Sequence, residues 1–148
     1  MDTSPLPEPQ LSALYQELIL DHYRRPRNKG ALEHPTHTAS LTNPLCGDEI
    51  DLHLLVDGDV VKEVRFIGRG CSISQASASM MTQAVKEKPL AEALALAQRM
   101  RVMMHGDEGA ARDKALGSLR ALAGVSKFPV RVKCAMLPWT ALEEAFKR

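Results

Sequence analysis

The sequence predicts an α+β domain, because a β-hairpin is followed by a run of helical segments. Apolar and polar residues alternate over residues 49–56, as in a half-buried strand, and residues 60–67 form the returning strand. Asp57-Gly58-Asp59, a turn signal, separates the two strands. After Gly70 the apolar residues recur at helical spacing instead.

The apolar residues of the hairpin are expected to face a common core. This set comprises Ile50, Leu52, Leu54 and Val56 on the first strand, and Val64 and Phe66 on the second. Residues 28–44 are loop-like, with a short edge strand expected near residues 38–41.

Helical patterns cover residues 10–25, 72–86, 90–104, 112–123 and, in part, 126–148. Pro26 ends the first helix and Gly106 ends the third, while Pro138 is expected to kink or restart the last. The methionines of the middle helices are expected to fill the core rather than to form a cofactor site. They are Met80, Met81, Met100, Met103 and Met104.

A chain of 148 residues favours one domain, expected over residues 10–148 after a disordered, proline-rich tail at residues 1–9. The formal net charge of +1 argues against nucleic acid or an acidic membrane surface as the partner. The sequence shows neither a membrane span nor a secretory signal. We therefore expect a cytoplasmic protein, in whose reducing environment cysteines more often bind metal or react than form disulfides.

Three cysteines carry the clearest chemical signal in the chain. Cys46 lies in the run Cys46-Gly47-Asp48, Cys71 precedes a predicted helix, and Cys134 comes late in the sequence. Gly47 allows the backbone to turn, so that Cys46 and Asp48 could face the same ion. Three thiols and one carboxylate supply the four donors of a tetrahedral zinc site. The alternative is three buried cysteines without a function, since free cysteine is among the most buried residue types.

Two cations stand next to the last cysteine. Arg131 and Lys133 would both favour the thiolate form of Cys134, and a helix N-terminus would do so for Cys71. The histidines are scattered, and none is adjacent to a cysteine. They are expected on the surface or in loops, not as ligands: His22, His34, His37, His53 and His105.

A basic cluster follows the first predicted helix and consists of Arg24, Arg25, Arg27 and Lys29. One interpretation is a solvated helix end, where cations oppose the negative end of the helix dipole. The other is a docking patch for a partner protein.

The chain resembles the U-type iron–sulfur assembly proteins, the IscU/SufU (NifU N-terminal-like) family. Several motifs carry this resemblance in order from Leu14 onward. They are Asp21-His22-Tyr23, Pro26-Arg27-Asn28-Lys29-Gly30, Asn43-Pro44, Cys46-Gly47-Asp48, Gly70-Cys71-Ser72-Ile73-Ser74, Ala76-Ser77-Ala78-Ser79 and Lys133-Cys134-Ala135. Lys133 stands where the IscU pattern has a histidine, and the stretch between Cys71 and Cys134, which includes residues 111–125, is longer than in IscU. Within the family, the chain is thus similar to the SufU type.

The resemblance implies a small, mainly antiparallel sheet of about three strands with helices packed on one face. It implies a zinc ion bound by Cys46, Asp48, Cys71 and Cys134. It also implies two partners: a PLP-dependent, SufS-like cysteine desulfurase as sulfur donor and a downstream scaffold of the SufBCD type. Arg131 and Lys133 would then balance the charge of the ligands.

Three functions follow as hypotheses. The leading one is a zinc-dependent sulfurtransferase that accepts persulfide sulfur on Cys46, because Pro44 and Gly47 mark its segment as a loop whereas Cys71 is tied to a helix start. The second is a scaffold that holds a nascent iron–sulfur cluster. The third is a structural zinc domain that serves only protein contacts.

Overall fold

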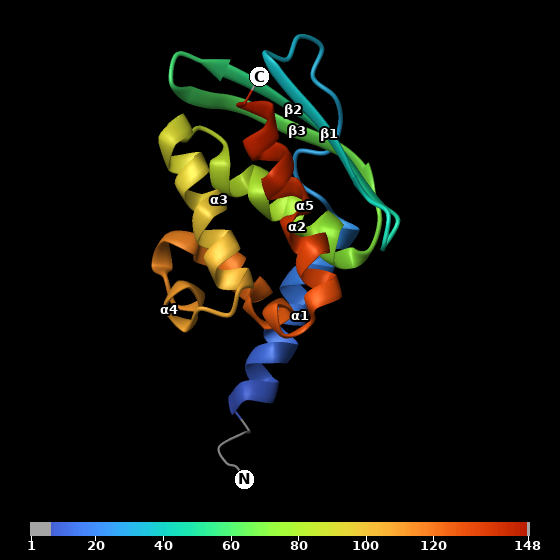
Figure 1. Ribbon diagram of the computed structural model, residues 1–148, viewed down its shortest axis with the longest axis vertical. Coiled ribbons are helices and arrows are strands. Elements are labelled where there is room, and N and C mark those ends of the chain that lie inside the picture. Colours follow the sequence, from blue (N-terminus) through green and yellow to red (C-terminus); the bar gives the residue numbers. More distant parts are fainter. Residues whose placement is uncertain (1–6, 148) are drawn as a thin grey trace.

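The computed structural model describes residues 7–147, with side chains from residue 15 onward (Figure 1). The elements follow the chain as α1 (Pro7–Arg24), β1 (His37–Asn43), β2 (Asp48–Asp57), β3 (Val60–Arg69), α2 (Ser72–Val85), α3 (Leu90–Met104), α4 (Glu108–Ala111), the 3₁₀ segment η1 (Lys114–Lys127) and α5 (Pro129–Ala145). The α+β prediction is confirmed.

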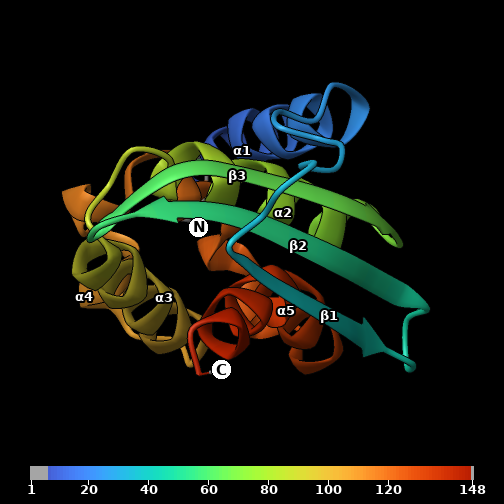
Figure 2. The same ribbon diagram turned by 90° about the horizontal axis from the view of Figure 1, so that it is seen from above.

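The three strands form one antiparallel sheet in the order β1-β2-β3. Helices α2 and α5 pack against one face of the sheet, as Figure 2 shows from above. The predicted hairpin is confirmed as β2 and β3. The expected edge strand is β1, which is longer than predicted.

Alternation along the strands decides which side chains enter the core. Ile50, Leu52 and Leu54 are buried, as are Val64 and Phe66 on β3. Val56 is only partly buried, because a bulge between Leu55 and Val56 shifts the register there. The same alternation, followed back toward the β1–β2 turn, turns Asp48 and Asn43 inward.

The methionine prediction is confirmed, since all five side chains are buried between the helices. The helix predicted at residues 112–123 was wrong, whereas α5 lies within the last segment, which was predicted to be partly helical. The predicted helix at 112–123 is instead the short α4 and the irregular η1, because Gly117 has φ 54° and ψ −129° and interrupts the helix. Helix α5 begins with Pro129 in its first turn and continues through Pro138.

Helix α1 begins at Pro7, three residues before the predicted start at Gln10. The predicted tail therefore overlaps the helix at residues 7–9, and its residues 1–6 lie outside the described part of the chain. Within residues 7–147, no helix combines the length and the apolar character that crossing a membrane requires.

A polar junction holds the end of α1 and the loop after it against α2. His22 is buried and its Nδ1 lies 2.7 Å from Ser79 Oγ, so its predicted surface location is wrong. The backbone N–H of Arg27 donates to the same Oγ at 2.8 Å. On α2, one turn after Ser79, Thr82 Oγ1 accepts a hydrogen bond from Asn28 Nδ2 at 3.0 Å. The junction thus fixes the middle of α2, the helix that directly follows Cys71.

The basic cluster after α1 is partly neutralised by one carboxylate. Asp21 pairs with Arg25 at 2.9 Å and with Arg27 at 2.7 Å. The hydrogen bond from Arg27 and the charges of both arginines lower the pKa of Asp21, against the opposing effect of burial. Two of the four cations therefore serve the fold directly.

The junction predicts a stability effect at Ser79. We expect Ser79→Ala to lower the free energy of unfolding by about 1–3 kcal/mol, because a buried imidazole and a backbone N–H both lose their partner. The measurement is urea denaturation, with Ser118→Ala as a control on the exposed surface of η1. Equal stability of the two variants would contradict this role for Ser79.

His22 predicts a pH effect on stability. Burial, followed by the nearby charge of Arg27, lowers the pKa of His22 below its ordinary value of 6.5. The unfolded chain then takes up the proton at a higher pH than the folded chain, so acid favours unfolding. Between about pH 7.5 and pH 5.5 we expect wild type to lose more stability than His22→Gln. The matched control is the exposed His34→Gln, which should follow wild type in pH-dependent thermal unfolding.

Candidate metal centre

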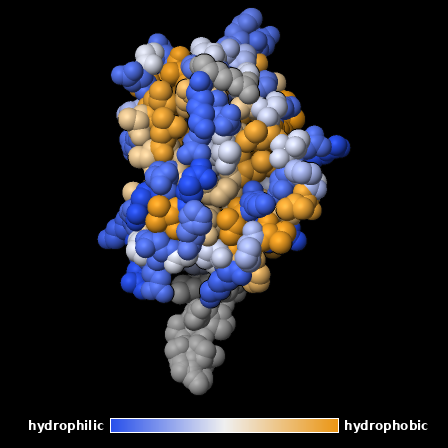
Figure 3. Space-filling view, viewed as in Figure 1, coloured by the Kyte–Doolittle hydropathy of each residue, from blue (hydrophilic) through white to orange (hydrophobic). Residues whose placement is uncertain are grey.

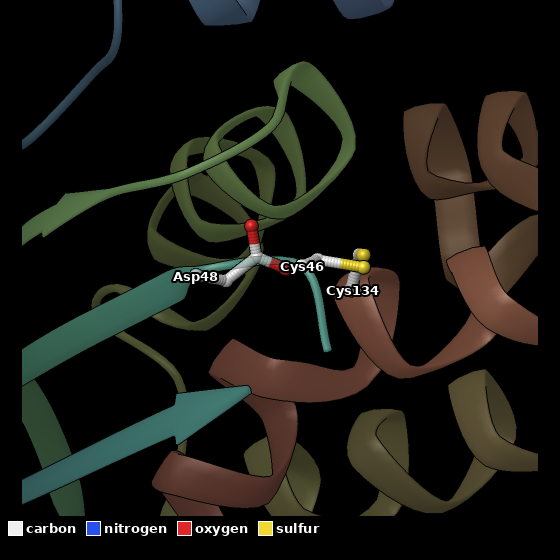
Figure 4. A group of neighbouring side chains, drawn as sticks. All are labelled: Cys46, Asp48 and Cys134. Carbon is white, nitrogen blue, oxygen red and sulfur yellow. The ribbon is translucent and has the colours of Figure 1, made fainter. Parts of the chain in front are cut away.

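Four segments meet at one end of the sheet: the end of β1, the β1–β2 turn, the start of α2 and the second turn of α5. The ligand atoms of Cys46, Asp48 and Cys134 all lie within 4.8 Å of one another. In Figure 4 the two sulfur atoms lie next to each other, and one oxygen of Asp48 points toward them. In the described part of the chain, this is the one group of three or more such side chains close enough to hold a metal ion.

Asp48 occupies the first inward-facing position of β2 and is fully buried. Its Oδ1 accepts the backbone N–H of Cys71 at 2.9 Å, and its Oδ2 accepts Asn43 Nδ2 at 3.4 Å. Burial alone would raise the pKa of Asp48. The Cys71 N–H, followed by the side chains of Cys134, Ser74 and Asn43, outweighs burial and lowers that pKa. The structure therefore holds an ionised carboxylate in the core, ready to bind a cation.

Gly70 makes this arrangement sterically possible. Its φ of +148° lies in a region that favours glycine, and a Cβ would overlap the Asp48 carboxylate and approach Asp48 Cα to 2.9 Å. The close passage of β3 into α2 beside Asp48 is what allows the Cys71 N–H to reach the carboxylate.

Cys71 is the N-cap residue of α2, and its Sγ accepts the backbone N–H of Ser74 at 3.5 Å. The Cys71 sulfur is not part of the group within 4.8 Å, although its thiol still contributes to raising the pKa of Cys134. The structure thus brings together three of the four predicted ligands and places Cys71 beside them.

Cys134 is fully buried on α5. Asn43 Nδ2 lies 3.8 Å from its Sγ, and the thiol can donate to the carbonyl of Val130 at 3.8 Å. Burial, and then contact with Asp48, Cys46 and Cys71, raises the pKa of Cys134 well above that of a free thiol. A buried thiol in this setting stays neutral by keeping its proton, or its thiolate form is stabilised by a bound cation. When a metal ion binds, it takes the place of the proton.

The two predicted cations have different surroundings. Arg131 is exposed one turn before Cys134, and the thiols of Cys134, Cys71 and Cys46 all raise the pKa of its guanidinium. Lys133 is also exposed but lines a hollow of about 420 Å³ between β1, α3 and α5. Arg131 therefore lies within electrostatic reach of the three thiols.

The donor set fits a zinc ion by its chemistry. Cysteine sulfur and carboxylate oxygen are both common zinc ligands, and three thiolates with one carboxylate complete a tetrahedral site. Four neighbours stabilise the ionised carboxylate of Asp48, and the guanidinium of Arg131 interacts with the buried sulfur of Cys134.

Sequence reasoning missed two residues that support the ligands. Asn43 was noticed only as part of a motif, yet it contacts Asp48 and Cys134. Ser74 is buried behind Cys71, and its side chain helps to lower the pKa of Asp48. Asn43 could have been found from β1, because alternation with the buried Ala39 turns it toward the core.

Exposed apolar side chains surround the candidate centre. Leu45 is 70% exposed, Phe128 is 61% exposed and Val130 is 58% exposed. Figure 3 shows hydrophobic side chains gathered over the β1–β2 turn and the start of α5. A hollow of about 400 Å³ opens beside them, with Tyr15 and Phe128 in its lining. A patch of this kind marks a contact surface more often than chance exposure.

Comparison with known proteins identifies the family of this chain. Residues 14–143 match the family described as the NifU-like N terminal domain. The chain is 50% identical over 136 residues to the zinc-dependent sulfurtransferase SufU of Bacillus subtilis (strain 168), covering 90% of each protein. It is 47% identical over 139 residues to the iron–sulfur cluster assembly scaffold protein IscU of Streptococcus pyogenes serotype M1, covering 94% of this chain and 86% of that protein.

A solved structure shows the same fold. The putative iron–sulfur cluster assembly scaffold protein for the SUF system of Fervidobacterium islandicum AW-1 superimposes with a TM-score of 0.83 at 37% identity. The match covers 90% of this chain and 96% of that one. The chain therefore belongs to the NifU-like N-terminal domain family, the IscU/SufU group of iron–sulfur cluster assembly proteins.

Proposed function

We propose that the chain is a zinc-dependent sulfurtransferase, which accepts persulfide sulfur from a PLP-dependent cysteine desulfurase for iron–sulfur cluster biogenesis. The observation that carries this proposal is the Cys46–Asp48–Cys134 group, in which Asp48 and Cys134 are buried and Cys46 is partly exposed on a turn. The similarity to a protein named a zinc-dependent sulfurtransferase supports it.

Cys46, Asp48, Cys71 and Cys134 would hold the zinc ion. Bound zinc would keep the thiols as thiolates without oxidising them, because zinc has no redox chemistry. The four ligands carry a total charge of −4, so the loaded site has a net charge of −2. Arg131, whose pKa is raised by all three thiols, would offset part of that charge.

The three thiols differ in how firmly the fold holds them. Cys134 is buried within a helix, and Cys71 caps another helix through its sulfur. Cys46 is partly exposed on the β1–β2 turn, where its backbone N–H donates to the carbonyl of Asn43 at 3.2 Å. Cys46 can therefore leave the ligand set with the least disturbance of the fold.

The transfer itself is a thiol–persulfide exchange. The Cys46 thiolate attacks the terminal sulfur of the donor's cysteine persulfide and forms a new S–S bond. The donor's S–S bond breaks, and the donor cysteine leaves as a thiolate. No net oxidation takes place, since the sulfur atom passes from one thiolate to another. Arg131 would attract the anionic persulfide to the site.

The exposed apolar residues around Cys46 suit the docking of the desulfurase. Leu45 adjoins the acceptor cysteine, while Phe128 and Val130 lie at the start of the helix that carries Arg131 and Cys134. Burial of these side chains would bring a partner's reactive segment to Cys46 and exclude water from the exchange.

A scaffold for a nascent iron–sulfur cluster is the second candidate, because three thiols at one site could also bind iron. The similarity to a protein named as such a scaffold favours it. Lys133 argues against it, since this residue replaces the histidine of the IscU pattern. A purely structural zinc site is disfavoured by the partly exposed position of Cys46 on a turn.

The ligand set predicts the metal content of variants. Wild type purified without air should contain one zinc ion per chain, and Cys46→Ala, Cys71→Ala, Cys134→Ala and Asp48→Ala should each lose most of it. Thermal stability should fall when the metal is lost, because metal binding contributes to folding free energy.

Elemental analysis measures the zinc occupancy of each variant. Full zinc content in all three cysteine variants would refute the ligand set, and iron with sulfide in wild type would favour the scaffold.

The acceptor assignment predicts where sulfur accumulates. Wild-type chain should raise the turnover of a cysteine desulfurase, because it removes the persulfide that blocks the next cycle, whereas Cys46→Ala should not. Mass spectrometry after a brief reaction should find added sulfur on Cys46 and little on Cys71 or Cys134. Sulfur mainly on another cysteine would overturn the assignment, even if the rate rose.

A further inference from the structure

Asn43 lies at the last inward-facing position of β1 and is directly opposite Asp48 in the antiparallel ladder. Its side chain is buried, with 7% of its surface exposed. A core-facing position on an edge strand would ordinarily hold an apolar residue, as Ala39 does on the same strand. A buried amide here needs hydrogen-bond partners, and the partners identify its role.

Asn43 contacts three of the four proposed ligand residues. Its Nδ2 lies 3.4 Å from Asp48 Oδ2 and 3.8 Å from Cys134 Sγ. Its backbone carbonyl accepts the N–H of Cys46 at 3.2 Å and so closes the turn that carries Cys46. One residue thereby links the ligands of β2 and α5 to the β1–β2 turn.

The chemistry of the amide suits this place. Asp48 and Cys134 are neighbours that would both be anionic as ligands, and they would repel each other. The NH₂ group of Asn43 has two hydrogen atoms and no charge, so it can donate to the carboxylate and the sulfur together. An aliphatic side chain would leave both anions without this donor, and a carboxylate would add a third negative charge.

We infer that Asn43 is a positioning residue of the metal centre, whose amide holds Asp48 and Cys134 in place when Cys46 leaves the ligand set. This inference rests on the proposed zinc site. Partners that orient metal ligands commonly change metal affinity by about 10- to 100-fold when they are removed. Asn43 would thus keep Asp48 and Cys134 in their ligand geometry while Cys46 is briefly displaced during the exchange.

The test compares Asn43→Ala and Asn43→Asp with Thr42→Ala. Asn43→Ala removes both donors, and Asn43→Asp keeps the shape but replaces the donors with acceptors. Thr42 is the neighbouring residue on β1 and is exposed on the opposite face of the sheet, so Thr42→Ala is a matched control. Zinc affinity is measured by competition with a chromogenic chelator. The absorption spectrum of the Co²⁺-loaded protein reports ligand geometry, and thermal unfolding of the metal-free protein reports the fold.

We expect the zinc dissociation constant to rise by about 10- to 100-fold in Asn43→Ala, and the cobalt absorption bands of Asn43→Asp to differ from those of wild type. The cobalt absorption bands should shift in Asn43→Ala, which a purely structural role would not cause, and Thr42→Ala should match wild type throughout. An Asn43→Ala protein with wild-type zinc affinity and cobalt spectrum would overturn the inference. The inference would also be overturned if the zinc affinity of Asn43→Ala fell only in proportion to a lower thermal stability of the metal-free protein. Wild type without zinc would refute the proposed centre itself, which separates the two failures.

Discussion

The burial of the Asp48 carboxylate is the constraint on which the rest of the site depends. Alternation along β2 turns this residue into the core, where an unpaired charge would cost on the order of several kcal/mol. The charge is tolerated because donors from other elements meet it: Asn43 from β1, and the Cys71 N–H and Ser74 from the start of α2. The end of the sheet and the start of the helix are thereby tied to one carboxylate.

This constraint places the three thiols on elements of different rigidity. The chain must turn sharply between Asn43 and Asp48, so Cys46 lies on a turn. It must enter α2 directly beside the carboxylate, so Cys71 becomes the helix cap. Helix α5 covers the remaining side and brings a buried Cys134. The fold therefore separates thiols that can hold a metal from one that can also react.

The sequence predicted the parts of the fold that local patterns determine. Alternation located β2 and β3, and helical spacing located α2 and α3, because these patterns report burial directly. Gly117 broke a predicted helix through a left-handed backbone conformation, which apolar spacing does not reveal. His22 was misplaced because its burial depends on Ser79, a partner on another helix.

In the candidate site, too, local sequence patterns predicted the ligand residues but not the contacts between distant segments. Cysteine contexts and the family resemblance pointed to Cys46, Asp48, Cys71 and Cys134, and three of these meet in the structure. The fourth, the sulfur of Cys71, accepts a hydrogen bond from the Ser74 N–H instead of joining the other ligand atoms. No sequence pattern predicts this hydrogen bond. The role of Asn43 could not be predicted without the register of β1 against β2, because this register places Asn43 opposite Asp48.

The motifs that carry the family resemblance fall into two groups, which hold α2 at two different places. Asp21, Arg27 and Asn28 belong to the junction that anchors the middle of α2 through Ser79 and Thr82. Asp48 and Gly70 anchor the first turn of the same helix. Held at both places, α2 cannot easily shift Cys71, and packing of α5 holds Cys134 equally firmly. If a partner changes the proposed ligand set on docking, we therefore expect the change on the β1–β2 turn, where Cys46 lies.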